Sequence, residues 1–343
     1  MSSDSAPPQD ASAPFSGAAD PEESMPPSDF IIRSGDLVDL HVHKDILKFV
    51  SVFFKNMLDG ADPNELQRDG KPIVVLPEPI SVLYRLLSIA YPGRSAEYCS
   101  LSEQTLDGVS VVYQTANKYL FMAAQKSLRD MLEDPTLLRA HPHRLFAIAR
   151  LCDLPVLARK AALCTLESPV CSHPLLFLEM ELLTAATFHK LYDFHHSCGT
   201  AAQKIAEETG GPLHIFGIGD PEYYHITCTS TNSGSATLVW WQYLKSSANE
   251  CGSADVDEEH WGYPRRTAAQ WFRNHAARLG TKLRAVPARH TVEAEALKIA
   301  PADRSVIDGC PNCRYKAEEH LASFAPQLAV YIEASNLKLA QDL

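Results

Sequence analysis

The chain lacks any apolar run that approaches the ~20 residues needed to cross a membrane. It also lacks a basic start followed by an apolar stretch, the pattern of a secretion signal. We therefore expect no membrane segment and a location in the cytoplasm or nucleus. Its nine cysteines are an odd number, which favours reduced thiols or a metal site over a disulfide framework. With 343 residues, 45% of them hydrophobic, the chain has material for about two domains.

Positive charge is absent from the first 32 residues. Six acidic residues precede Arg33 and account for six units of the net charge of -11, so the rest of the chain carries only -5. This part of the chain is mildly acidic, so it is not expected to bind nucleic acids in general, because such binding depends on neutralising phosphates. Residues 1–28 are dominated by Ser, Pro, Ala and acids, with Phe15 as their single aromatic residue. This composition predicts a disordered acidic tail, and a docked peptide is the alternative.

Between residues 29 and 133 the pattern changes to short strands and amphipathic helices. Phe30–Arg33 and Leu37–Val42 flank Ser34-Gly35-Asp36, which is typical of a β-hairpin. Apolar residues at positions 46–58 recur at intervals of three and four residues, which predicts consecutive short helices. The spacing further along predicts a strand at Ile73–Leu76 and helices at Pro79–Ala90, Ser102–Lys118 and Phe121–Leu132.

After residue 133 the sequence predicts mostly helices, with Pro135 and Pro142 as breaks. Helices are expected at Arg144–Cys152, Pro155–Leu166, Pro174–Leu183 and Thr184–Glu208, and later at Thr267–Leu279 and Lys316–Leu339. The last of these is expected to be kinked or broken at Pro326. The predicted organisation is α+β: a first domain at 29–133, a helical extension at 134–209, and an α-rich C-terminal module at 210–343.

Five ordered blocks stand out in the first domain. They are Asp29-Phe30-Ile31-Ile32, Val42-His43-Lys44, Ser51–Met57, Ile89–Gly93 and Ala116–Leu120. Together they resemble a BTB/POZ domain, and specifically the divergent BTB proteins of fungi. The resemblance implies a small sheet flanked by helices, followed by a helical extension. It also implies a homodimer that recruits a partner, with a cullin scaffold or transcriptional regulators as the candidate partner classes.

The candidate partner-binding residues follow from this resemblance and from the tendency of sheet edges and apolar patches to associate. The dimer contact would fall on the first strand and helix, at Phe30, Ile32, Val50, Phe53 and Phe54; packing in the chain's own core is the alternative for each. In cullin adaptors a hydrophobic-x-Glu triplet precedes a late helix, and Leu101-Ser102-Glu103 stands at the comparable place. A helix start, with Ser102 as cap and Glu103 in the first turn, explains the same triplet without a partner.

Cys310-Pro311-Asn312-Cys313 is the strongest candidate for a metal site. A Cys-x-x-Cys pair directs two thiolates toward one point, as tetrahedral zinc requires, but a structural site needs two more ligands. Cys228 and His225 are the first candidates for these, and Cys198 is a further one. A structural zinc that stabilises the C-terminal module is therefore one prediction; a redox dithiol and free thiols are the alternatives.

Motifs of the common enzyme classes are missing from the sequence. It contains no Gly-x-Ser-x-Gly elbow, no phosphate-binding glycine-rich loop, no dinucleotide fingerprint and no His-Glu-x-x-His. We therefore predict a non-enzymatic protein that acts through BTB-mediated dimerisation and partner recruitment, as a ubiquitin-ligase adaptor or a transcriptional scaffold. The alternative is a hydrolase or redox enzyme whose active site lies in residues 210–343.

Overall fold

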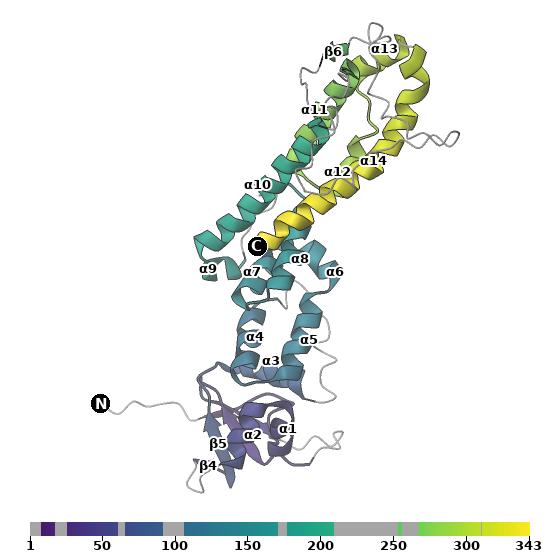
Figure 1. Ribbon diagram of the computed structural model, residues 1–343. Helices are drawn as coiled ribbons and strands as arrows, with labels where there is room; N and C mark the ends of the chain where they lie inside the picture. The colour runs from purple at the N-terminus through teal and green to yellow at the C-terminus, as the bar shows by residue number, and fades with distance from the viewer. Residues whose placement is uncertain are drawn as a thin grey trace. The chain divides into compact units, whose positions relative to one another are not determined.

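Two compact units make up the described part of the chain (Figure 1). The computed structural model describes residues 8–17, 26–60, 66–91, 106–170, 177–208, 253–255, 267–309 and 311–343. Unit 1 extends to Leu157 and includes Phe177–Leu182, whereas unit 2 comprises Ala158–Leu176 and Leu183–Leu343. The expected extension at 134–209 is therefore divided, because some of its helices pack in unit 1 and others in unit 2.

Unit 1 is built on a five-stranded mixed sheet with the strand order β1-β3-β2-β5-β4. The strands are β1 (Gln9–Asp10), β2 (Phe30–Arg33), β3 (Val38–Val42), β4 (Gln67–Arg68) and β5 (Lys71–Val75). β2 and β3 form the expected antiparallel hairpin, and β5 lies parallel to β2. The hairpin turn requires Gly35, since a Cβ there would come 2.4 Å from the main-chain oxygen of Pro77.

Five helices follow in this unit, close to the positions that the sequence predicts. They are α1 (Lys44–Val50), α2 (Val52–Asp59), α3 (Ile80–Ala90), α4 (Val109–Lys118) and α5 (Met122–Leu132). Ser51 separates α1 from α2 with an extended backbone, and its hydroxyl caps α2 by accepting the N–H of Phe54 at 3.1 Å. The helix expected at Ser102–Lys118 is wrong at its start, because residues 106–108 are not helical and α4 begins at Val109, after Gly108 at a φ of 71°.

Helix α6 (Pro135–Ala140) is absent from the sequence-based prediction, which treats Pro135 as a break. Proline is well tolerated at the first helical position, where its missing N–H would have no intrahelical partner. Asp134 caps the helix, because its carboxylate accepts the N–H groups of Thr136 at 2.8 Å and Leu137 at 3.2 Å. The proline therefore starts this helix instead of interrupting one.

A buried ion pair joins the last two helices of unit 1, α7 (Pro142–Leu151) and α9 (Glu179–Leu182). Arg144 is 8% exposed and Glu179 is 1% exposed. The Arg144 Nε donates to Glu179 Oε2 at 2.9 Å, and the same guanidinium also binds Asp107. These contacts hold the short helix α9 against α7.

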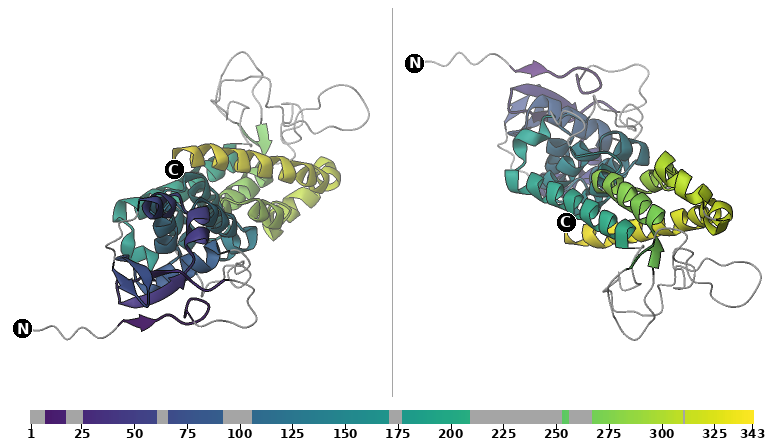
Figure 2. Two further views of the ribbon diagram at one scale, coloured as in Figure 1. Left: turned by 90° about the horizontal axis from the view of Figure 1, so that it is seen from below. Right: turned by 90° about the horizontal axis from the view of Figure 1, so that it is seen from above.

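Unit 2 is mostly helical (Figure 2), and it has a hydrophobic core of its own. Its elements are most of α8 (Pro155–Thr165), α10 (Ala185–Glu208), β6 (Ser253–Asp255), β7 (Thr267–Ala269), α11 (Gln270–Ala285), α12 (Arg289–Glu295), α13 (Pro301–Gly309), α14 (Pro311–Leu339) and a final 3-10 turn at Ala340–Asp342. α11 and α14 pack against α10, and α12 and α13 pack against α14. The expected α-rich character of the C-terminal region is confirmed, although the sequence pattern missed α12 and α13.

The last helix, expected to be kinked or broken at Pro326, is not broken there, because α14 continues through that residue. Pro326 lies on the exposed side of the helix. A proline there removes one main-chain hydrogen bond, but water can bind the carbonyl group that loses its partner. The helix therefore tolerates the proline at a position where a buried one would be costly.

Residues 1–28 are predicted to be disordered. This prediction is wrong for residues 8–17, which are ordered and which we call the strap. Its strand β1 pairs in parallel with the edge strand β3, with Gln9 opposite Val38. Phe15 is only 1% exposed. A short polar segment can thus be ordered when a sheet edge satisfies its backbone and one aromatic side chain is buried.

Candidate functional site

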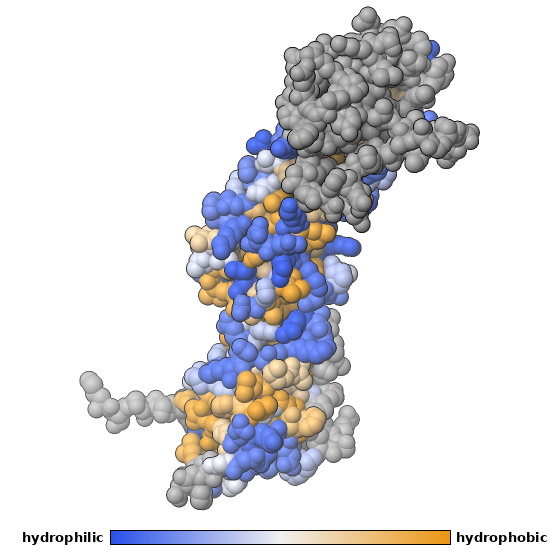
Figure 3. All heavy atoms as spheres, in the orientation of Figure 1, coloured by the Kyte–Doolittle hydropathy of each residue, from blue (hydrophilic) through white to orange (hydrophobic). Residues whose placement is uncertain are grey.

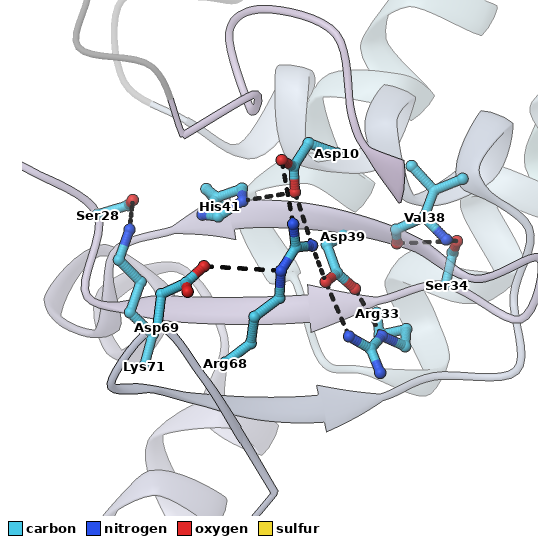
Figure 4. A network of polar contacts seen from close by, with 10 residues as sticks. All are labelled: Asp10, Ser28, Arg33, Ser34, Val38, Asp39, His41, Arg68, Asp69 and Lys71. Atoms are coloured by element: carbon cyan, nitrogen blue, oxygen red, sulfur yellow. Dashed lines mark hydrogen bonds and ion pairs between the residues drawn. The ribbon is translucent and has the colours of Figure 1, made fainter. Parts of the chain in front are cut away.

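An ionic network ties the strap to three strands of the unit 1 sheet (Figure 4). Asp39 on β3 is fully buried and accepts hydrogen bonds from Arg33 Nε at 2.6 Å and Arg68 Nη1 at 2.6 Å. Arg68 Nη1 also donates to Asp10 Oδ1 of the strap at 2.8 Å, and His41 Nε2 lies 3.0 Å from the same oxygen. Four strands, β1 to β4, are joined by this one network.

The carboxylates of the network are held in their charged form. Burial by itself would raise the pKa of Asp39, but hydrogen bonds from Arg33 and Arg68 outweigh it, so the pKa lies below its ordinary value. The pKa of Asp10 is also lowered, mainly by its hydrogen bond with His41. Carboxylates that stay charged at neutral pH suit a structural network, whereas a general acid needs a raised pKa.

Helices α1 and α2 carry exposed hydrophobic side chains, which we call the α1–α2 surface. Phe49 is 85% exposed and Val52 is 51% exposed. Where α1 and α2 lie in Figure 1, the surface drawn in Figure 3 has hydrophobic areas next to hydrophilic ones. Large apolar side chains that remain open to water mark candidate contact sites for another protein.

Polar side chains secure the junction between β3 and α1. The carboxylate of Asp29 accepts the backbone N–H of Lys44 at 2.9 Å. The backbone N–H of His43 donates to the hydroxyl of Tyr91 at 2.9 Å. Both bonds satisfy donors at the start of a helix, which have no partner within the helix itself.

A second group of polar contacts secures the end of α4. Lys118 Nζ and the hydroxyl of Tyr119 donate to the two carboxylate oxygens of Glu78, at 2.5 Å and 2.7 Å. The hydroxyl of Ser51 donates to the main-chain oxygen of Tyr119 at 2.7 Å. These contacts join Glu78 and two of the sequence blocks, Ser51–Met57 and Ala116–Leu120, at the end of α4.

Comparison with protein-family models matches residues 21–136 to the BTB/POZ domain. This part of the chain is a BTB/POZ domain. Its small mixed sheet with flanking helices is the predicted fold, and the domain is a protein–protein interaction module. The match does not distinguish the fungal branch of the family. A search of curated proteins finds no match to the chain.

Three of the predicted partner-binding residues lie in the core of the BTB domain. Phe30, Ile32 and Phe54 are each 1% exposed, as the alternative interpretation expects. Val50 and Phe53 are partly buried, and the ring of Phe53 packs edge-on against that of Phe54 at a centroid distance of 5.3 Å. Phe49 and Val52 are therefore more exposed than any of the five predicted residues.

The other predicted site residues fall mostly outside the part of the chain that the structure describes. These are Leu101 and Glu103 of the adaptor triplet, and Cys310, Cys228 and His225 of the zinc site; for Cys313 only the backbone is described, in the first turn of α14. Both sites stay predictions. Across the described residues no three His, Cys, Asp or Glu side chains are grouped so as to hold a metal ion.

Two of the described cysteines, one in each unit, are packed in the core, whereas Cys164 is partly exposed. Cys198 on α10 is 0% exposed, and burial raises the pKa of its thiol to about 12. Cys152, at the end of α7, is 8% exposed, and burial raises its thiol pKa to about 12 as well. A thiol with such a pKa remains protonated at neutral pH, so neither residue is an activated nucleophile.

The sequence analysis did not single out two features of unit 1, the exposed Phe49 and the ordered strap. Phe49 falls off the helical stripe formed by Ile46, Leu47 and Val50, which is the signal that it faces away from the core. For the strap, the available signal is Phe15 as the only aromatic residue of a polar segment. Separately, none of the helices described is both long and apolar enough to cross a membrane.

Proposed function

We propose that this protein is a non-enzymatic interaction protein that forms a homodimer through the α1–α2 surface of its BTB domain and recruits a partner. The observation that carries the proposal is the 85% exposure of Phe49, with Val52 half exposed on the next helix. Burying a phenylalanine side chain stabilises an association by about 1.5–3 kcal/mol. A twofold dimer buries the same surface from both copies, which doubles this contribution.

Light scattering of the full chain at tens of micromolar tests the dimer. We expect the mass of two chains for the wild type and of one chain for Phe49→Glu, because a charge at the centre of an apolar contact loses its hydration. Leu337→Glu is the matched control: Leu337 is also a solvent-exposed apolar residue, 56% exposed, but it lies on α14 of unit 2. A monomeric wild type, or a dimer that survives Phe49→Glu, would contradict the proposal.

The recruited partner is proposed to be a cullin scaffold, with transcriptional regulators as the other class that the family resemblance implies. The protein would act in the cytoplasm or nucleus. The support for an adaptor role is the BTB domain together with the Leu101-Ser102-Glu103 triplet. Purified cullin should bind the full chain, and Leu101→Ala/Glu103→Ala should weaken binding at least tenfold while the dimer mass stays unchanged. If cullin does not bind the wild type, the adaptor role is excluded and a transcriptional scaffold is the remaining proposal.

A further inference from the structure

The strap occupies the outer edge of the BTB sheet as an added strand. Gln9 N–H donates to the Leu37 oxygen at 3.2 Å, and Ala11 N–H donates to the Asp39 oxygen at 2.9 Å. Further along, His41 N–H donates to the oxygen of Phe15 at 3.0 Å. Main-chain bonds of this kind let a sheet edge bind an extended peptide whatever its side chains are.

Side-chain pockets beside this edge give it specificity. The ring of Phe15 lies edge-on to those of Tyr84 and Tyr91, at centroid distances of 5.5 Å and 5.3 Å. The hydroxyl of Tyr84 also donates to the main-chain oxygen of Ala13 at 2.6 Å. Gly17, at a φ of 75°, lies against the His41 ring, where a Cβ would come within 2.7 Å.

At the other end of the strap, a pair of polar groups receives a carboxylate. Asp10 is bound there by Arg68 and His41. Read from Asp10 to Gly17, the strap has an aspartate, a phenylalanine five positions later, and a glycine two positions after that. The residues of the strap that make these side-chain contacts thus follow the pattern Asp-x-x-x-x-Phe-x-Gly.

The residues at which the strap binds have other partners that remain when the strap is removed. Asp39 retains both of its arginine partners, Arg33 and Arg68. Tyr91 retains the N–H of His43 at its hydroxyl. Release of the strap therefore leaves no buried charge without a partner, which would be the costly outcome.

We propose that the groove between the β3 edge and the Tyr84–Tyr91 pocket is a recognition site for an extended segment of a partner protein with the pattern Asp-x-x-x-x-Phe-x-Gly, and that the strap occupies it in cis. Charge complementarity argues for this occupant, because Arg68 and His41 face the carboxylate position. Twelve residues separate Gly17 from Phe30, so the tethered strap competes at an effective concentration of the order of millimolar. A partner segment must bind more favourably than the strap or meet the chain after the strap has been displaced.

A labelled peptide with the sequence of residues 8–17 serves as the probe, and fluorescence anisotropy measures its binding to the full chain. In the variant Asp10→Asn/Phe15→Ala the cis strap is weakened, so the variant should bind the peptide at least tenfold more tightly than the wild type does. Peptides that carry Asp10→Asn, Phe15→Ala or Gly17→Ala should bind the variant at least tenfold more weakly than the unaltered peptide. The single variant Phe15→Ala, which disturbs the fold less, should show the same order of affinities.

Three results would overturn the proposal. In the first, both folded variants bind the peptide no better than the wild type. In the second, they bind it but do not discriminate against the altered peptides. In the third, mixing Phe49→Glu with Asp10→Asn/Phe15→Ala/Phe49→Glu at micromolar concentration gives a dimer mass by light scattering that neither chain shows alone, because the occupant would then be the strap of a second copy. Phe49→Glu should leave peptide binding unchanged, so failure of this proposal and failure of the proposed dimer are distinguishable.

Discussion

Both units have an apolar core, and what distinguishes unit 1 is an ionic network that joins four strands around the fully buried Asp39. In unit 1, charged and polar groups bind particular partners, as Asp39 binds Arg33 and Arg68 and as Glu78 binds Tyr119. In unit 2, the core is a set of aliphatic and aromatic side chains around Trp271. Apolar helix packing can be satisfied by many sequences of suitable volume, whereas polar contacts require particular residues at particular positions.

Truncation of the aromatic centre of unit 2 should have the largest effect. Trp271 is 1% exposed, and its ring packs edge-on against Phe272 at 6.0 Å. Trp271→Ala should lower the free energy of unfolding by about 4 kcal/mol, because it removes buried area and leaves a cavity. Hydrogen exchange should then show lost amide protection in α10, α11 and α14, with protection kept in β2, β3 and β5. Equal loss in both units would show that their cores are not separate.

The corresponding change in unit 1 is the removal of a charge from the network. Asp39→Asn should cost about 3 kcal/mol at pH 7 in urea unfolding, since it leaves Arg33 and Arg68 without their shared carboxylate. The lowered pKa of Asp39 means that its contribution is present above its unfolded-state pKa, about 4, and is lost as pH falls through the folded-state value. The difference from the wild type should therefore shrink at low pH.

A neighbouring carboxylate provides the control for this substitution. Asp69 is 78% exposed at its side chain and lies 3.7 Å from Arg68 Nε. Exposed ion pairs contribute little, so Asp69→Asn should change the stability by less than about 0.5 kcal/mol. If the two substitutions had similar effects, the burial of Asp39 would not be what makes the network important.

Two glycines test how closely α10 and α11 pack in unit 2. A Cβ at Gly199 would come 2.3 Å from the main-chain oxygen of Arg284, so Gly199→Ala should force the helices apart and cost about 2 kcal/mol. A Cβ at Gly280 would meet only the flexible side chains of Glu207 and Gln203, at 3.0 Å and 3.2 Å. Gly280→Ala should therefore be close to neutral, because the gain in helix propensity, up to about 1 kcal/mol, offsets this mild crowding. Thermal unfolding of the two variants and the wild type measures these changes in stability.

Features set by local periodicity were predictable from the sequence. The pattern predicts a helix at Thr184–Glu208, and α10 spans Ala185–Glu208. Helix α6 was missed because Pro135 has opposite meanings at the start and in the middle of a helix. The strap was missed because its order depends on a sheet edge and an aromatic pocket that local sequence cannot show.

The candidate site was predictable in its region but not in its residues. Phe30, Ile31 and Ile32 are consecutive and all buried, so both faces of β2 are covered within the chain itself. A sequence pattern shows that such residues are apolar, but it does not show whether their contacts come from the same chain or from a partner. The position of Phe49 off the helical stripe is a usable signal in the sequence, but its 85% exposure is established only when the helices are placed.

Buried histidines should make unit 2 more sensitive to mild acid than unit 1, and this is the smallest effect that we expect. His275 on α11 is 2% exposed, and its Nε2 has no hydrogen-bond partner. Burial lowers the pKa of His275, and the nearby Arg278 lowers it further, while a bond with the Ala296 main chain and the charge of Asp303 oppose the shift. Burial also lowers the pKa of His195 on α10.

The sign of the pH effect follows from these directions. The unfolded chain binds protons at these histidines near pH 6.5, whereas the folded chain resists them. Their contribution to stability is therefore complete above about pH 6.5 and declines as the pH falls below it. Hydrogen exchange at pH 7.5 and 5.5, corrected for intrinsic rates, should show a loss of protection in α10 and α11 with little change in β2 and β3. His275→Gln should reduce that loss, because glutamine does not titrate; an unchanged loss would assign the acid sensitivity to other groups of unit 2.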